Sequence, residues 1–471
     1  MPDEAQSVRA HAARTDAAAA LATGPEALLG LPPLQAIARL ALPTTLVMLV
    51  AATSNVLYTY FVSRLGADAI AAVSLVFPVS ILAITAMAGG IGAGVSSAVA
   101  RALGAGHRNE AARIAEQGLS LAVLLGLAFG LLILVAARPF FALLGGRDVA
   151  LDAATIFARV LFGGAAITFT GGMLDSILRG EGNVRVPAIW STTSLVLQMA
   201  FTPLFMFGFG WGLPGAAVAT LSAQMLATLP RARYVFGGHG ALRLVPRPQP
   251  IRRTPLREIL RVGVPASLAT ILSQLGVMVL TGVLGHLGQA HLAAYGLGTR
   301  LDFLLLSFAY GVGAALLTLV GMASGARRPE QVLGYVGRAA AIAFLLLGVP
   351  GVVLWARPAL WVDLFTTDPA IRDVSTSYFR IIGPSYPFLG VSMTLAFAFQ
   401  GLGRAGAALV WMAVRTVGVL GVALLCTQLL GLADRAVFTT VAIANVVSAF
   451  ALGALFLRLW HRQATEASRS S

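Results

Sequence analysis

The sequence predicts an all-α polytopic membrane protein whose twelve transmembrane helices form two similar six-helix lobes. Three observations support this prediction: a strongly apolar composition, apolar runs of membrane-spanning length, and an internal repeat. Of the 471 residues, 58% are hydrophobic and 11% are charged. A soluble protein carries roughly 25% charged residues, so this chain has too few to cover a surface that faces water.

The internal repeat consists of matching residues about 221 positions apart. The first pairs, at an offset of 222, are Leu34 and Leu256, Arg39 and Arg261, and Pro43 and Pro265. After the loss of one residue the offset becomes 221, and the later pairs are Arg159 and Arg380, Gly180 and Gly401, and Trp190 and Trp411. Two similar membrane lobes with a cavity between them are the architecture of secondary transporters, so the repeat favours transport.

The apolar runs are each long enough to cross about 30 Å of hydrocarbon. In the first half they cover residues 40–62, 69–98, 111–136, 151–178, 186–208 and 213–234. In the second half they cover residues 259–284, 292–320, 331–356, 372–400, 407–429 and 434–458. Because each repeat has an even number of spans, both lobes enter the membrane with the same orientation.

The arginines predict that orientation, because positively charged connections stay in the cytoplasm. They gather in alternate connections, and the richest is the central linker, with Arg231, Arg233, Arg243, Arg247, Arg252, Arg253, Arg257 and Arg261. Both termini are therefore expected to be cytoplasmic, in a bacterial inner membrane. The N-terminal segment lacks the apolar core of a cleaved signal peptide. The predicted domains are a tail (1–33), an N-terminal lobe (34–235), a linker (236–255), a C-terminal lobe (256–460) and a tail (461–471).

Composition and motifs argue against several function classes. All 33 basic residues are arginine, which excludes a lysine-dependent phosphate loop and a Schiff-base catalyst. The net charge of +14 comes from clusters between apolar runs, so nucleic acid is not an expected partner. Neither an HExxH nor a GxSxG motif is present, so we expect no enzyme and no cofactor or metal beyond a coupling ion.

Short motifs in the same order across both repeats indicate a family. They lie at residues 55–66, 90–94, 100–106, 178–182, 203–210, 324–330 and 399–403. In these motifs the chain resembles the multidrug and toxic compound extrusion (MATE) family of the MOP superfamily, over nearly all residues after 34. The resemblance implies a MATE-like, V-shaped monomer in the lipid bilayer. It also implies export of amphipathic, often cationic, small molecules. Inward flow of protons is the favoured driving force, and inward flow of sodium ions is the alternative.

The resemblance also identifies ion-coupling positions, and this chain fills them with uncharged side chains. Tyr58 stands where many relatives carry a carboxylate in the first helix. Gln198 and Thr202 replace an Asn and an Asp of the fifth helix, and Ser273 and Gln274 replace a carboxylate of the seventh. The sequence therefore leaves the coupling ion, and coupling itself, open.

Two carboxylates within the predicted spans are candidates for cation coupling. Asp302 lies about ten residues, roughly 15 Å of helix, from the expected outer end of the eighth span. A carboxylate at that depth is functional by default, although an ion pair with Arg300 is the alternative. Asp175 is the second candidate, and its spacing of four residues from Arg179 is equally that of a structural ion pair.

Polar residues in mid-span are the candidates for a substrate cavity. They are Asn55, Tyr58, Gln198, Thr202, Gln274, Arg300 and Tyr386. Hydrogen bonds between helices would explain most of them equally well. Arg159 and Arg380 are expected to reach the outer interface or to tie helices together, with attraction of anionic groups as the alternative.

A second function class remains open, a flippase for lipid-linked saccharide or lipid cargo. The loss of the usual coupling acids favours it. Such a flippase is expected to line its cavity with several basic residues. The candidates within spans are Arg159, Arg300, Arg380 and Arg415.

Overall fold

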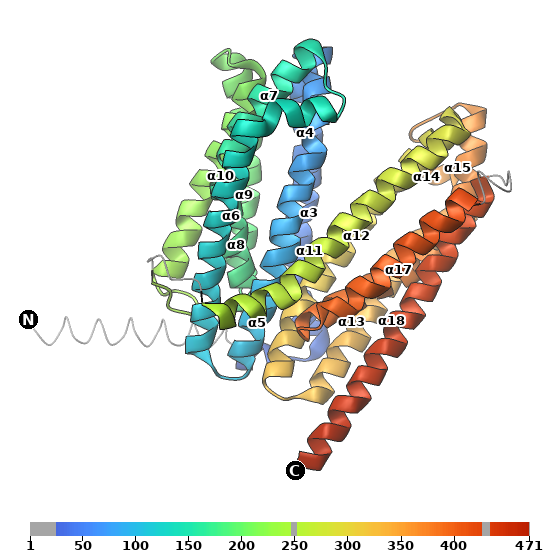
Figure 1. Ribbon diagram of the computed structural model, residues 1–471. Helices are drawn as coiled ribbons and strands as arrows, with labels where there is room; N and C mark the ends of the chain where they lie inside the picture. The colour runs from blue at the N-terminus through green and yellow to red at the C-terminus, as the bar shows by residue number, and fades with distance from the viewer. Residues whose placement is uncertain (1–24, 246–251, 426–433, 471) are drawn as a thin grey trace, which may run out of the picture. The chain divides into compact units, whose positions relative to one another are not determined.

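The computed structural model describes residues 25–245, 252–425 and 434–470. Helices make up almost all of this described part, and it contains no strand (Figure 1). Eleven helices are long and apolar enough to cross a membrane, or twelve when α7 (Asp148–Gly163) and α8 (Ala165–Gly180), bent by 47°, count as one span. The predicted all-α architecture of twelve spans is confirmed.

The helices of the first repeat extend beyond the predicted apolar runs. A short helix, α2 (Pro25–Leu29), precedes them within the predicted N-terminal tail. The spans are α3 (Pro33–Ser63), α4 (Ala67–Ile84) with η1 (Thr85–Ile91) and α5 (Gly92–Gly104), α6 (Arg108–Leu143), α7 with α8, α9 (Arg185–Pro203) with η2 (Leu204–Gly208), and α10 (Gly212–Phe236). In hydrocarbon every backbone polar group must be bonded within its own segment, which is why apolar runs of this length form helices.

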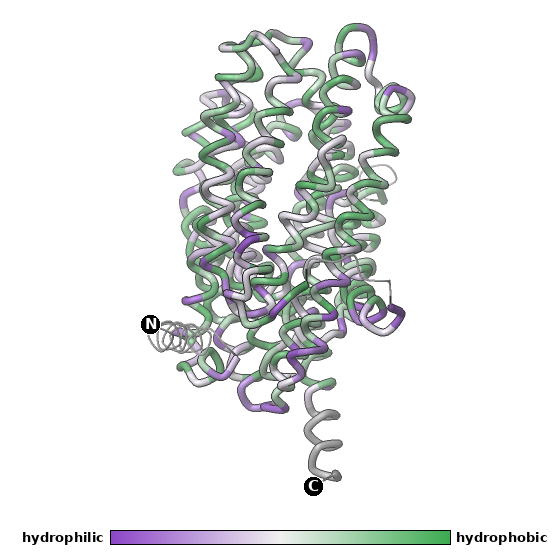
Figure 2. The backbone as a smooth tube through the Cα atoms, turned by 90° about the vertical axis from the view of Figure 1, so that its left-hand side faces the viewer, coloured by the Kyte–Doolittle hydropathy of each residue, from purple (hydrophilic) through white to green (hydrophobic). Residues whose placement is uncertain are grey.

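The second repeat gives the same series of spans. They are α11 (Arg253–Leu287), α12 (Gln289–Gly325), α13 (Pro329–Ala356), α15 (Pro369–Ile382) with η3 (Gly383–Ser385) and α16 (Tyr386–Gly401), α17 (Ala405–Leu424) and α18 (Asp434–Ser470), with the short α14 (Ala359–Val362) before α15. Figure 2 shows hydrophobic residues along most of the helix lengths and hydrophilic residues mainly at helix ends and connections. This distribution is the one expected for helices that face lipid.

The chain folds as two compact units, each with its own packed core. Unit 1 contains Leu46–Ser267, and unit 2 contains Pro32–Thr45 and the residues from Leu268 onward. The division falls inside α3 and α11, whereas the predicted lobes begin at residues 34 and 256. The start of α3 therefore packs with unit 2, and the start of α11 packs with unit 1.

A glycine contacts the first part of α3 within unit 2, and an equivalent glycine contacts the first part of α11 within unit 1. In unit 1, a Cβ on Gly90 would overlap Ser267, whose Oγ donates to the carbonyl of Ala86 at 2.8 Å. In unit 2, a Cβ on Gly311 would overlap Thr45 Oγ1. Gly90 and Gly311 are 221 residues apart, and Thr45 and Ser267 are 222 apart, which are the offsets of the repeat. The close approach of each helix start therefore depends on glycine.

The connection after α10 is fastened to unit 1 by side-chain acceptors. Three of its backbone N–H groups donate to side-chain oxygens, Ala241 to Glu181 Oε2 (3.0 Å), Val245 to Glu116 Oε1 (3.1 Å) and Arg252 to Gln117 Oε1 (3.0 Å). Leu242 and Leu244 are buried in the core of unit 1. Both described ends of the predicted linker are thus anchored on the same unit.

Candidate functional site

The polar centre of unit 2 is built around Asp302 of α12. The phenol Oη of Tyr386, on α16, donates a hydrogen bond of 2.7 Å to Asp302 Oδ1. Tyr386 follows the 3-10 turn η3, which interrupts the tenth span, and its side chain is 1% exposed. Gly351 of α13 lets this turn approach, because a Cβ there would lie 2.5 Å from the carbonyl oxygen of Gly383. The interruption of the span therefore places a phenol against the carboxylate.

Two further tyrosines lie near Asp302. Tyr378 of α15 is 2% exposed, and its ring occupies the space that a Cβ on Gly298 of α12 would fill. Its ring centre is 6.4 Å from that of Tyr295. The expected alternative partner, Arg300, is exposed on α12 and lies over the ring of Phe365, 5.4 Å from the ring centre. Within the described residues, the one hydrogen-bond partner of the Asp302 carboxylate is the phenol of Tyr386.

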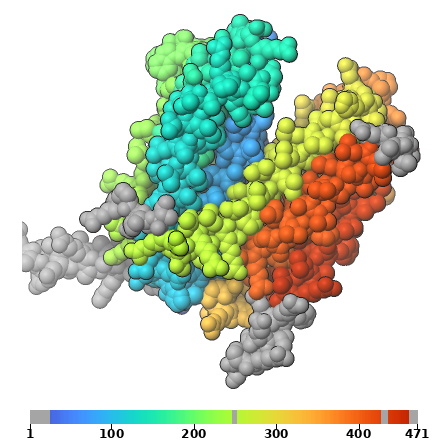
Figure 3. Space-filling view, in the orientation of Figure 1, coloured from blue at the N-terminus to red at the C-terminus, as the bar shows by residue number. Residues whose placement is uncertain are grey.

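A second polar chain in unit 2 begins at Arg415 of α17. Its guanidinium donates to Asn445 Oδ1 of α18, and Asn445 Nδ2 donates to Ser385 Oγ at 3.0 Å. Ser385 directly precedes Tyr386 in the sequence, and Tyr386 contacts Asp302, so this series of polar residues extends to the carboxylate. Figure 3 shows α17 and α18 side by side on one face of unit 2. A cation and a carboxylate thus stand at the two ends of one polar path through the unit.

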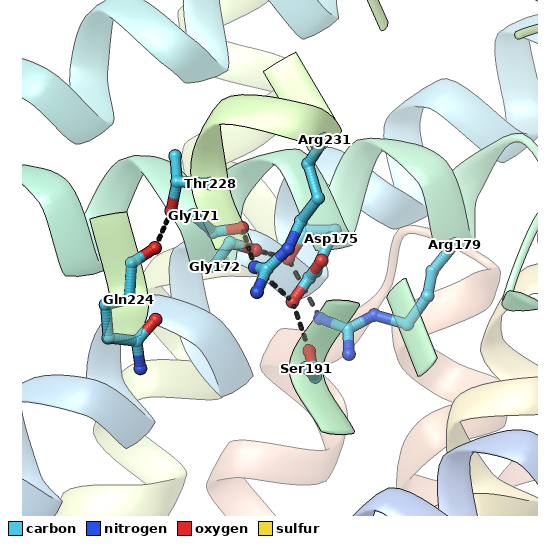
Figure 4. Close-up of polar contacts among 9 residues, drawn as sticks. Gly171, Gly172, Asp175, Arg179, Ser191, Gln224, Thr228 and Arg231 are labelled. Atoms are coloured by element: carbon cyan, nitrogen blue, oxygen red, sulfur yellow. Dashed lines mark hydrogen bonds and ion pairs between the residues drawn. The ribbon is translucent and has the colours of Figure 1, made fainter. Parts of the chain in front are cut away.

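In unit 1, two buried charged residues of the spans, Asp175 and Arg231, are paired with each other. Asp175 of α8 accepts hydrogen bonds at 3.1 Å from Arg231 of α10 and at 3.1 Å from Ser191 of α9 (Figure 4). Arg231 also donates to the carbonyl of Gly171 at 3.3 Å, and its side chain is 3% exposed. Arg179, the partner considered from the sequence, donates to Ser176 Oγ at 3.1 Å. The arrangement is a buried ion pair that joins α8, α9 and α10.

Arg231, which the orientation argument groups with the arginines of the linker, lies inside α10 and is buried. The arginine pattern did not separate it from the neighbouring arginines of the connection. A signal was available in the spacing of four residues from buried Ala227, which places both on one helix face. The sequence also gave no indication that Ser385 and Tyr378 would lie near Asp302.

The other cavity candidates lie on three helices. Gln198 and Thr202 of α9 come together, since Gln198 Nε2 donates to Thr220 of α10 at 3.0 Å and Thr202 Oγ1 donates to the carbonyl of Gln198 at 2.7 Å. Tyr58 of α3 packs against the core of unit 1. Asn55 of α3 is exposed, and Gln274 of α11 is part-buried. Arg159 and Arg380 are both exposed, on α7 and α15.

Comparison with known proteins places the chain among membrane transporters. A family model described as MatE matches residues 43–204 and 265–427, one segment in each repeat. A FAD transporter of Shewanella oneidensis is 28% identical over 75% of this chain and 78% of its own length. A multidrug export protein MepA of Staphylococcus aureus is 24% identical over 85% of this chain and 89% of its own length.

Among solved structures, a MOP superfamily transporter from Pyrococcus furiosus superposes with a TM-score of 0.84 and 29% identity. The superposition covers 95% of this chain and 99% of the archaeal one. The family match thus includes a segment of each repeat, and the structural match extends over nearly the whole chain.

Proposed function

Because the chain belongs to the multidrug and toxic compound extrusion (MATE) family and is a multi-pass membrane transporter, we propose that it is a secondary antiporter. It exports amphipathic, cationic small molecules in exchange for protons, by alternating access. The observation that carries this proposal is the hydrogen bond from Tyr386 to Asp302, whose carboxylate has no basic side chain as an ion-pair partner among the described residues. A carboxylate that is ionised and has no ion-pair partner is costly within a membrane span, so binding of a proton or a cation is favoured there.

The geometry favours a proton over a sodium ion. Tyr386 donates to one oxygen of Asp302, which leaves the other oxygen for one proton or for the cationic group of a substrate. A hard metal cation takes several oxygen ligands. Protonation of Asp302 would remove the negative charge that holds the substrate, which supplies the exchange that an antiporter needs.

Asp175 is proposed to be structural. Its carboxylate is already balanced by Arg231, so loading it with a cation would require that ion pair to break. We assign coupling to Asp302, and we place Asn55, Tyr58, Gln198, Thr202, Gln274 and Tyr386 at the substrate pathway. Arginines in alternate connections support cytoplasmic termini in the plasma membrane.

Transport in proteoliposomes tests this proposal. The cationic dye rhodamine 123 is followed under an imposed pH gradient, and separately under a sodium gradient, with the wild-type chain, Asp302→Asn and Asp68→Asn. Asp68 is an exposed carboxylate in the first turn of α4, so its variant controls for loss of one negative charge. We expect proton-driven transport that Asp302→Asn abolishes and Asp68→Asn retains. Transport that needs sodium, or that survives in Asp302→Asn, contradicts the proposal.

A further inference from the structure

The two repeats differ in how the arginines within their spans are paired. In unit 1, Arg231 is neutralised by Asp175 at 3.1 Å. In unit 2, Arg415 has only the neutral amide oxygen of Asn445 as a partner within the described residues. Arg415 lies in the middle of α17 (Ala405–Leu424), in a span of mean hydropathy 1.9. A guanidinium at that depth is costly unless an anion or a polar cavity accompanies it.

Asn445 satisfies only a small part of this guanidinium. An arginine presents five N–H donors in a planar fork that matches the two oxygens of a carboxylate or phosphate. The amide oxygen of Asn445 accepts from one of its terminal nitrogens, and the Asn445 amide is committed in turn to Ser385. Arg415 is part-buried, so the rest of the fork is accessible to a ligand.

A second donor lies on the same face of α17. Trp411 precedes Arg415 by four residues, the spacing that brings side chains together on a helix. Its indole Nε1 is buried and has no hydrogen-bond partner in the described part of the chain. A buried indole N–H normally finds an acceptor. These two side chains only donate hydrogen bonds, and neither has an anionic partner among the residues that the structure describes. Together they fit an acceptor with negative charge.

The repeat argues against a role that merely ties helices together. Trp411 and Asn445 have counterparts at the repeat offset of 221, Trp190 and Gln224, but the counterpart of Arg415 is the buried Ser194. Unit 1 therefore has no charge at the position equivalent to Arg415, and Arg231 of α10 is paired with Asp175. A guanidinium at this position is a feature of unit 2 and not of the packing that the two repeats share.

We propose that Arg415 and the Trp411 Nε1–H form an anion-binding site in unit 2, which takes a carboxylate or phosphate group of the transported compound. This inference rests on the proposed transport function and deepens it. The path from Arg415 through Asn445 and Ser385 to Tyr386 connects the site to Asp302, which attracts the cationic group. The substrate class is therefore amphipathic compounds that carry both charges.

Binding of two matched dyes to the purified full-length chain tests the site without any ion gradient. Rhodamine 110 carries a free carboxylate, and rhodamine 123 is its methyl ester. Fluorescence anisotropy gives a Kd for each with the wild-type chain, Arg415→Gln, Trp411→Phe and Arg338→Gln. Arg338 is exposed and donates to the carbonyl of Gly334 in its own helix, so its variant controls for loss of one positive charge.

We expect Arg415→Gln to weaken rhodamine 110 binding about tenfold and to leave rhodamine 123 binding within about twofold. Only rhodamine 110 has a carboxylate that can pair with the guanidinium, so only its binding loses a hydrogen-bonded charge pair. Trp411→Phe should weaken rhodamine 110 selectively by about threefold, and Arg338→Gln should change neither dye. If Arg415→Gln does not fold, Trp411→Phe decides, because it removes only an N–H.

An unchanged ratio of the two Kd values in both variants overturns the site, as does a wild-type chain that binds neither dye. Dihexanoylphosphatidylglycerol serves as a competitor in a separate arm. A soluble carboxylic acid that is not fluorescent, such as benzoate, is the reference competitor. If the lipid displaces rhodamine 110 more effectively than this acid does, the site belongs to a lipid headgroup, and the assignment to the transported compound is overturned. Because binding needs no gradient, the dye ratio can hold even where proton-driven transport fails, so the two proposals are tested separately.

Discussion

Tyr386 donates a hydrogen bond of 2.7 Å to Asp302, and this contact joins α16 to α12 inside unit 2. The phenol holds the carboxylate in one orientation and stabilises its charge. A hydrogen bond to a charged group contributes about 1.5–3 kcal/mol. The pair is therefore the proposed coupling element, and both of its members lie in spans.

Tyr386→Phe removes that donor and keeps the ring. We expect proton-driven transport of rhodamine 123 to fall about tenfold, because the carboxylate loses the group that orients it. Initial rates in proteoliposomes measure the effect. Tyr310→Phe is the matched control, since Tyr310 lies on the same helix as Asp302 and packs its ring against Phe397. Equal losses in the two variants would contradict the role of Tyr386.

The ion pair of Asp175 and Arg231 predicts strong coupling between two substitutions. Asp175→Ala or Arg231→Leu alone leaves one buried charge unpaired, so each should cost about 3–5 kcal/mol of unfolding free energy. The equivalent positions of the second repeat hold Ala396 and Leu452, so the double variant has the residue types of that repeat. It should recover most of the loss. Unfolding of the detergent-solubilised protein measures all three. Additive losses would show that the two charges do not interact.

Glu181 predicts a dependence of stability on pH. Its side chain lies at the end of α8, outside the spans, and burial raises the pKa of Glu181 to about 8, although hydrogen bonds from the backbone of Ala241 and Leu242 lower it in part. A carboxyl group whose pKa is higher in the folded state stabilises the fold below its unfolded pKa of 4.5 and loses that contribution as pH rises through about 8. The wild-type chain should therefore lose on the order of 2–4 kcal/mol across this window.

Glu181→Gln keeps the acceptor and removes the titration. Melting temperatures between about pH 5 and pH 9 should fall less in this variant than in the wild-type chain. Glu330→Gln, at an exposed position in the first turn of α13, controls for the loss of charge. Parallel melting curves for wild type and Glu181→Gln would contradict the assignment.

The equivalent glycine contacts predict different outcomes of rescue. Gly311→Ala and Gly90→Ala should each cost about 1–3 kcal/mol through overpacking. Thr45→Ala should rescue most of the loss in Gly311→Ala, because the remaining neighbours, the carbonyl of Ala41 at 3.1 Å and Thr45 Cβ at 3.3 Å, need to move by only a few tenths of an ångström. Ser267→Ala should not rescue Gly90→Ala, since the Cβ and Cα of Ser267 would still lie 2.7 and 2.8 Å away. Melting temperatures of the four variants test this, and rescue of both glycines or of neither would contradict it.

The candidate site was predictable in part. The depth of Asp302 in an apolar run identified it without a structure, and Tyr386 was named as a mid-span polar residue. The contact between them was not predictable, because it depends on how η3 turns the chain within the tenth span. Likewise, the sequence placed Asp175 beside Arg179, while the packing of α10 against α8 brought Arg231 to the carboxylate.

The sequence by itself determined that the chain is helical, how many spans it has and how the two repeats match. Those properties follow from local physics, because hydrocarbon forces each apolar run to satisfy its own backbone hydrogen bonds. Only the tertiary structure decided which charges are paired, and that the starts of α3 and α11 exchange between units. Side-chain partners come from residues far apart in the chain, and their contact depends on the close packing of helices at small residues, which no local pattern specifies.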